Sequence, residues 1–230
     1  MNYWKMKEIR YKMTLDVKHI LVIATLTFGL TTYSQNTSSE AKRLLDDVSN
    51  KVKDYDNITI DFKYTIANGA DGANQETRGD VTIEGDKYVL NILGITRIFD
   101  GTTLYTINPE DEEVTISSNN TDDEGSITPN TMLSFYEKGY SYSMDIVQDN
   151  NGRKIQYVKL TPTVSNSGIK HVLLGIDSKT HHIYNLIETS ADNSRSTFTV
   201  NSFKTNEPLS NTLFIFDESK YSNYFINRLD

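Results

Sequence analysis

Three histidines are the first residues in this chain whose type supports chemistry, because imidazole is a common metal ligand. They are His171, His181 and His182. His181 and His182 are adjacent in a strand-like run, which directs their side chains to opposite faces. No HExxH or comparable ligand spacing accompanies them. The pattern therefore favours surface histidines over a metal site, and no metal or other cofactor is expected.

Carboxylates and hydroxyls also lack a catalytic arrangement. Asp122, Asp123 and Glu124 are clustered, but without the ligand spacing of an EF-hand they indicate a solvated acidic loop rather than a calcium site. No GxSxG elbow or similar frame places a serine beside a base. The glycines are scattered singly among turns and form no phosphate-binding loop. The prediction is that the protein is not an enzyme.

Aromatic residues offer a different chemistry. The chain has 14 tyrosines and 9 phenylalanines, most of which are expected in the core or on a sheet surface. A closed barrel of about eleven strands is too wide for its own side chains to fill, and barrels of about eight strands already hold ligands. An interior lined by Ile, Phe, Tyr and Leu without fixed polar groups suits hydrocarbon. The sequence thus favours binding of an apolar ligand.

The N-terminus has the pattern of a secretory signal peptide. Lys5 and further basic residues precede Ile20 to Leu30, which carry no charge. This apolar run is shorter than the roughly 20 residues that span a bilayer. We expect cleavage near Ser34–Gln35, with an uncleaved anchor as the alternative. Residues 1–34 are therefore assigned to the signal peptide and residues 35–230 to a single domain.

The composition of the chain restricts the classes of molecule that it is expected to bind. The chain has no cysteine, which excludes a lipid-modified cysteine and disulfides. The net charge of −8 disfavours binding to nucleic acid and firm docking on anionic lipid headgroups. We expect an exported monomer that reaches membranes through specific partners.

Periodicity predicts two helices and many short strands. Ala41, Leu44, Leu45, Val48 and Val52 form one apolar stripe of a helix over residues 38–54. A second helix is expected between Thr128 and Gly139, which suit its two caps. Alternation predicts about six strands before the second helix and about five or six after it, over the ranges Ile58–Ile66, Thr77–Glu84, Lys87–Leu93, Ile95–Phe99, Thr103–Ile107, Val114–Ser117, Tyr140–Gln148, Lys154–Thr161, Lys170–Asp177, Ile183–Thr189, Ser196–Lys204 and Leu213–Phe216.

The predicted elements define a fold class. The chain is expected to be mainly β, of the α+β type, because many short strands at even spacing form a sandwich or a barrel. Both helices are amphipathic and need an apolar surface to cover. The sequence therefore predicts a strongly curved antiparallel sheet with helices lying across its open concave side.

Several segments in order resemble the LolA family of periplasmic outer-membrane lipoprotein carriers. The segment Ile98 to Pro109 carries Asp-Gly between two strands and ends in Asn-Pro, like a signature of that family. Weaker likenesses, which extend the resemblance over about 180 residues, are Val48-Ser49, Ile58–Ile66, Gly79–Ile83, Thr128-Pro129, Met132-Leu133, Lys159–Pro162 and Leu213–Asp217.

The resemblance implies an incomplete antiparallel barrel with a helical lid over an apolar cavity. It also implies a periplasmic carrier that takes lipoproteins by their acyl chains from an inner-membrane export complex to an outer-membrane acceptor. A lipid-sensing module on the same fold and a structural envelope protein without ligand are the alternatives. Alternation and helix faces assign the cavity to Ile58, Ile60, Phe62, Tyr64, Ile83, Tyr88, Leu90, Ile92 and Leu104, and the lid to Leu44, Leu45, Val48, Val52, Met132, Leu133, Phe135 and Tyr136.

One departure from the family concerns the lid. In the family an arginine just after the second strand contacts the lid and holds the empty cavity closed. Here that position falls at about Gly85, with Lys87 and Arg97 as the candidate substitutes. The resemblance therefore leaves open which residues hold the lid.

Overall fold

The computed structural model describes residues 37–67, 75–117, 133–164 and 167–229. The chain divides into two compact units, Met1–Thr37 and Ser38–Asp230. The second unit contains all of the strands and turns given below. The signal peptide predicted for residues 1–34 lies outside the described residues, so it and the domain boundary at residue 35 remain predictions.

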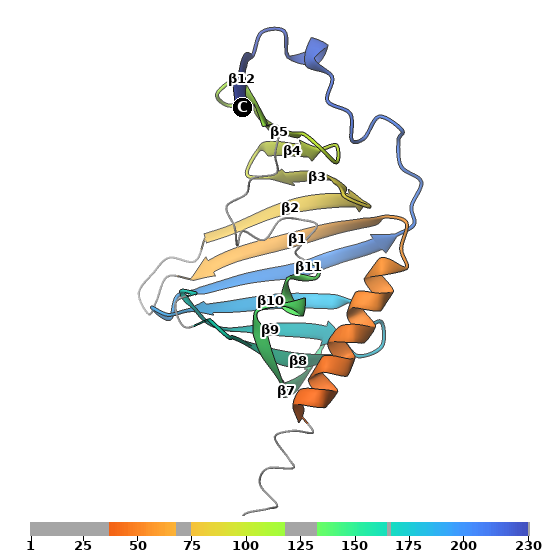
Figure 1. Ribbon diagram of the computed structural model, residues 1–230, viewed down its shortest axis with the longest axis vertical. Helices are drawn as coiled ribbons and strands as arrows, with labels where there is room; N and C mark the ends of the chain where they lie inside the picture. The colour runs from red at the N-terminus through yellow and green to blue at the C-terminus, as the bar shows by residue number, and fades with distance from the viewer. Residues whose placement is uncertain (1–36, 68–74, 118–132, 165–166, 230) are drawn as a thin grey trace, which may run out of the picture. The chain divides into compact units, whose positions relative to one another are not determined.

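One twelve-stranded sheet forms the second unit, in the order β12-β6-β5-β4-β3-β2-β1-β11-β10-β9-β8-β7 (Figure 1). Neighbouring strands are antiparallel except for the parallel pair β12 and β6. β12 and β7 are the two edges, so the sheet is not closed into a barrel. The strands are β1 (Ile58–Ala67), β2 (Gln75–Glu84), β3 (Lys87–Ile92), β4 (Ile95–Phe99), β5 (Leu104–Asn108), β6 (Glu113–Ser117), β7 (Tyr140–Asn150), β8 (Arg153–Pro162), β9 (Ile169–Asp177), β10 (Ile183–Ser190), β11 (Arg195–Thr205) and β12 (Phe225–Leu229).

A single α-helix, residues 37–53, is found in the described part of the chain, in agreement with the predicted range. Its residues Ala41, Leu45 and Val48 are buried, at spacings of four and three that place them on one stripe. None of the described helices combines the length and the apolar character needed to cross a membrane. Figure 1 shows this helix (orange) and the green turn around residue 135 on the same face of the sheet.

The two faces of the sheet are apolar in different regions. Ile60, Phe62 and Leu174 lie in the core that includes the helix, and we call their side the helix-side face. On β3 to β5 the register pairs Val89 with Ile98 and Ile98 with Tyr105. Successive side chains alternate between faces, so these three lie on the opposite side from Tyr88, Phe99 and Leu104 of the core. The sheet therefore has a second apolar surface, on its other side.

The C-terminal segment covers this second surface. It includes Leu213–Phe216, for which the prediction of a strand is wrong. These residues form turns and irregular backbone. We call residues 213–224 the strap. Phe216 stacks on Tyr105, with ring centroids 4.5 Å apart, and Phe214 is buried while Ile215 is exposed. The alternation that suggested a strand thus arises from one side of the strap packing on the sheet. The edge strand β12 follows the strap, in a region for which the sequence predicted no strand.

The second predicted helix is wrong in its described part. Residues 128–132 lie outside the described residues, and the rest contains one turn of 3₁₀-helix, η1 (Phe135–Glu137). A similar turn in the strap is η2 (Glu218–Tyr221). Lys138 is extended and Gly139 has a φ of +84°, a left-handed conformation that favours glycine. Gly139 therefore ends the turn as expected, but the turn is shorter than predicted.

Candidate functional site

The residues predicted to line a cavity share one apolar core. Ile58, Ile60, Phe62, Ile83, Tyr88 and Leu104 are buried in it. Tyr64, Leu90 and Ile92 are partly buried and pack against it. β8, β9 and β11 contribute further members that the sequence did not assign, among them Val158, Leu160, Val172, Leu174, Ile176 and Val200. The predicted set thus marks one half of a larger apolar surface.

The residues predicted for the lid lie in the same core. Leu45, Val48, Leu133 and Tyr136 are buried there. Met132 lies outside the described residues, and Leu44, Val52 and Phe135 are partly buried against the core. The helix and the segment around η1 therefore share one hydrophobic cluster with the sheet, as the amphipathic stripes required.

The interior beneath Leu133 is filled by side chains. The apolar cavity that Leu133 shares with Ile60, Leu174 and Phe198 has a volume of about 10 Å³. Pockets that hold drug-sized ligands measure about 300–1,000 Å³. The expectation of an interior left vacant is therefore wrong at this position. A separate pocket of about 320 Å³, lined by Val52, Ile58 and Ile83 among others, lies between the helix and the start of β1. Because Leu133 belongs to η1's segment, moving that segment is the step that would enlarge the space.

A glycine on the sheet positions two aromatic residues of this core. Gly79 on β2 pairs with Phe62 on β1, and a Cβ atom there would lie 2.6 Å from the Phe62 ring and 2.5 Å from the Asn91 carbonyl oxygen. The Phe62 ring in turn packs on Phe198, with centroids 4.7 Å apart. The missing side chain at Gly79 therefore makes the space into which the Phe62 ring fits.

Gly79→Ala is expected to destabilise the protein by about 2–3 kcal/mol, because neither the backbone oxygen nor the packed ring can yield freely. Gly94→Ala is the control, since a Cβ there meets nothing within 4 Å and only the φ of +76° opposes it. That control should cost about 1 kcal/mol. Urea unfolding of both variants measures the difference, and equal costs would contradict the packing account.

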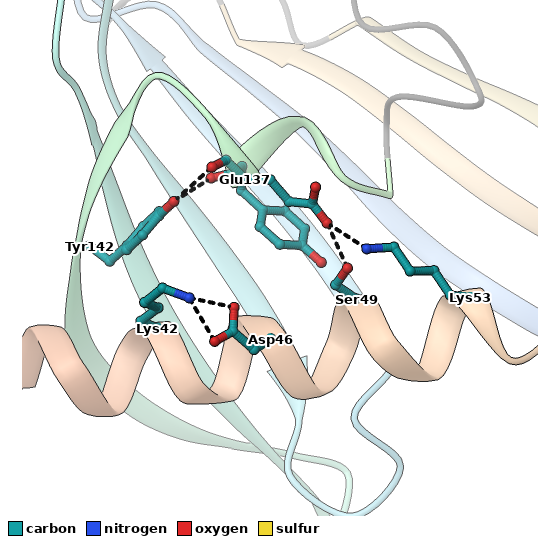
Figure 2. A network of polar contacts seen from close by, with 7 residues as sticks. Lys42, Asp46, Ser49, Lys53, Glu137 and Tyr142 are labelled. Carbon is teal, nitrogen blue, oxygen red and sulfur yellow. Dashed lines mark hydrogen bonds and ion pairs between the residues drawn. The ribbon is translucent and has the colours of Figure 1, made fainter.

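A group of polar contacts joins the helix to η1 and β7 (Figure 2). Ser49 Oγ donates to Glu137 Oε1 at 2.6 Å, and Lys53 Nζ lies 3.3 Å from the same oxygen. The Tyr142 hydroxyl donates to the Tyr136 and Glu137 carbonyl oxygens, at 2.9 Å and 3.3 Å. We call the contacts of Ser49, Lys53 and Tyr142 with η1 the clasp. The clasp closes the segment around η1 over the apolar core.

Electrostatics favour the ionised form of Glu137 in the clasp. The hydrogen bond from Ser49 lowers the pKa of its carboxyl group, and Lys53 acts in the same direction. The Glu137 side chain is 40% exposed, so solvent screens both interactions. A folded-state pKa below the unfolded value means that ionised Glu137 stabilises the clasp above the ordinary pKa, and that this contribution is lost as the pH falls through the lowered value.

Glu137→Gln is therefore expected to lower stability slightly, by about 0.5 kcal/mol, at neutral pH and to have no effect in acid below the lowered pKa. NMR titration of the Glu137 carboxyl group should show a midpoint below its ordinary value of 4.5. Ser49→Ala should move that midpoint upward. An unchanged midpoint in Ser49→Ala would show that the serine hydrogen bond does not hold the carboxylate.

The clasp supplies polar contacts between the helix and η1 at a place other than the position of the family arginine. Gly85 lies in the turn between β2 and β3 with a φ of +57°. In the described part of the chain, neither Lys87 nor Arg97 forms an ion pair with the helix or with η1. Ser49 and Glu137 are far apart in the sequence and belong to no motif, so sequence reasoning missed them.

A second contact that the sequence missed fixes the end of the helix. His182 was predicted as a surface residue, but it is half-buried and its Nε2 lies 2.8 Å from the Tyr55 hydroxyl. Its ring stacks on Phe203, with centroids 4.2 Å apart, and burial lowers its pKa. Within the described ranges, no three metal-ligating side chains come together. His182 thus serves packing at this position.

A profile of the family described as "Outer membrane lipoprotein carrier protein LolA" matches residues 53–217. A search of curated proteins found no match. The family match spans the segment from the end of the helix to the strap.

Solved structures are similar to this chain at low sequence identity. An uncharacterized conserved protein from Thermus thermophilus is 9% identical, with a TM-score of 0.57, over 83% of this chain and 99% of that one. LprF from Mycobacterium bovis is 16% identical, with a TM-score of 0.49, over 76% and 96%. A LolA superfamily protein from Nitrosomonas europaea is 12% identical, with a TM-score of 0.40, over 76% and 97%. The first of these supports the fold alone.

Proposed function

The chain belongs to the LolA family, and from this premise we propose that it binds the acyl chains of lipoproteins and carries them between membranes. The helix and η1 would cover the concave side of the sheet as a lid. The observation that supports this most is the joint apolar core, in which Leu45, Val48, Leu133 and Tyr136 pack against the helix-side face. A lid that shares its core with the sheet exposes a continuous apolar surface when it opens.

The energetics of acyl transfer require such a covered surface. Each methylene group removed from water contributes about 0.8 kcal/mol, so a chain leaves a membrane only for an equally apolar site. In the closed arrangement Leu133 occupies part of that site, because the cavity that it shares with Ile60 and Leu174 measures about 10 Å³. The acyl chain would then replace the lid residues on the sheet, and closure of the lid would favour release.

The proposed setting follows from the family and from the N-terminal sequence. A signal peptide would place the mature protein in the periplasm as a monomer. Lipoproteins would arrive from an inner-membrane export complex and leave for an outer-membrane acceptor. The activity is binding and transfer, without covalent chemistry.

Mass spectrometry of lipid that copurifies with the protein, followed by a transfer assay between vesicles, tests this function. The expected result is recovery of acyl species and movement of a labelled lipoprotein from donor to acceptor vesicles. Acyl binding without transfer would favour a lipid-sensing module. The absence of any acyl binding would favour a structural protein and end the proposal.

A further inference from the structure

The hydroxyl group of Tyr136 is buried without a hydrogen-bond partner among the described residues. The side chain is 1% exposed, and the ring belongs to the apolar core beneath the clasp. Other tyrosines near the site have partners: Tyr142 donates to η1, and Tyr55 pairs with His182. Tyr136 therefore differs from its neighbours in leaving a donor unused.

An unused donor opposes closure of the lid. Burying a hydroxyl group without a partner costs free energy that phenylalanine, of nearly the same shape, would not cost. Burial also raises the pKa of Tyr136, so the group stays protonated and remains a donor. The hydroxyl thus suits a partner that brings a hydrogen-bond acceptor into the core.

The position of Tyr136 indicates what kind of acceptor that is. Its ring lies in the apolar core, yet the residue also lines a polar pocket of about 390 Å³ beside the helix. The charges in this pocket are balanced: Lys42 pairs with Asp46 at 2.7 Å, and Lys53 with Glu137 at 3.3 Å (Figure 2). A ligand with its hydrocarbon in the core and its polar end in the pocket would place the junction near Tyr136. The balanced charges favour an uncharged junction over a carboxylate.

We propose that the Tyr136 hydroxyl recognises the carbonyl oxygen of an acyl ester or amide, where the hydrocarbon of the ligand meets its polar head. This rests on the proposed function, because the hydrocarbon of the ligand must first take the place of Leu133 on the sheet, while Tyr136 stays at the boundary between the core and the polar pocket. Tyr136 then selects acylated molecules over hydrocarbons that lack a carbonyl group. The same hydrogen bond gives the buried hydroxyl the partner that it lacks in the closed protein.

Two lipids that differ only in this group provide the test: 1-palmitoylglycerol, an ester, and 1-hexadecylglycerol, its ether counterpart. Calorimetry with the full chain should show about tenfold tighter binding of the ester. In Tyr136→Phe the two lipids should bind equally, because the donor is gone. This variant should also fold at least as stably as the parent protein, so loss of folding does not obscure the result.

Tyr142→Phe is the matched control. It removes a hydroxyl that already has partners, so it should change binding of both lipids alike and keep the preference for the ester. Equal binding of ester and ether to the parent protein, a preference that survives Tyr136→Phe, or tighter binding of palmitate than of the ester would overturn the proposal. Failure of the parent protein to bind either lipid would instead refute the proposed function.

Discussion

Acyl ligands are expected to lose about 100-fold or more in affinity when the helix is crosslinked to η1, because a locked lid leaves the open state unpopulated. The chain has no cysteine, so Ser49→Cys together with Glu137→Cys gives the only two thiols. The Ser49 and Glu137 side chains are in contact, with Oγ and Oε1 2.6 Å apart. A short reducible bis-maleimide can therefore join cysteines at these two positions. Binding of a fluorescent fatty acyl ester, titrated before and after crosslinking, measures the loss.

Reduction of the crosslinker provides the control for this experiment. The uncrosslinked variant lacks the Ser49–Glu137 hydrogen bond and should bind at least as tightly as the parent protein. Cleavage of the linker should restore that affinity. Unchanged binding by the fully crosslinked protein would show that ligands do not enter beneath the lid.

Leu133→Ala is expected to have the opposite effect, with apparent affinity for an acyl ligand rising about tenfold. Leu133 is 6% exposed and occupies the space between Ile60, Leu174 and Phe198 in the closed arrangement. Truncating it removes apolar contacts that only the closed lid makes, so the open state becomes more populated. Stopped-flow binding of the same fluorescent ester should show the gain mainly in the association rate.

Ile107→Ala removes the same number of carbon atoms from the other side of the sheet. Ile107 is 3% exposed and is not part of the helix-side core. Its truncation should cost about 2–5 kcal/mol of global stability while leaving ligand affinity unchanged. If both variants alter ligand binding alike, the effect of Leu133→Ala reports general loosening and not opening of the lid.

Short-range periodicity predicted β1 to β11 and the helix because each has a local signal. Alternation at Ile58, Ile60 and Phe62 specified a strand with one buried face, and the four- and three-residue spacings of Ala41, Leu45 and Val48 specified the helix. These signals depend on which side of an element is buried. They do not reveal which partner buries it.

The strap shows this limit. Phe214 and Phe216 alternate with Ile215 as strand residues do, but they pack on the second apolar surface, on β3 to β5, which no local pattern predicted. The parallel pairing of β12 with β6 depends on contacts more than 100 residues apart in the sequence, such as Phe225 with Glu113. Such pairings follow from the whole fold and not from the spacing of neighbours.

The burial of the apolar residues could be predicted from the sequence, and the polar contacts of the clasp were missed. Alternation and helix faces indicate which residues are buried, since burial imposes a period, but whether these residues line a cavity and form a lid stays a prediction. The clasp imposes no period on the sequence, because each of its residues is acceptable on any exposed surface. These residues are Ser49, Lys53, Glu137 and Tyr142. The filling of the interior by Leu133 also escaped prediction, since the sequence does not fix how far a lid enters the core it covers.

Photocrosslinking with a palmitoyl ester that carries a diazirine at the end of its chain tests most directly whether acyl chains lie between lid and sheet. Peptide mapping after irradiation is predicted to place the adducts on core residues of β1, β9 and β11, such as Ile60, Leu174 and Phe198. Adducts confined to exposed apolar side chains, such as Leu93 at 73% exposure or Phe225 at 68%, would contradict the account.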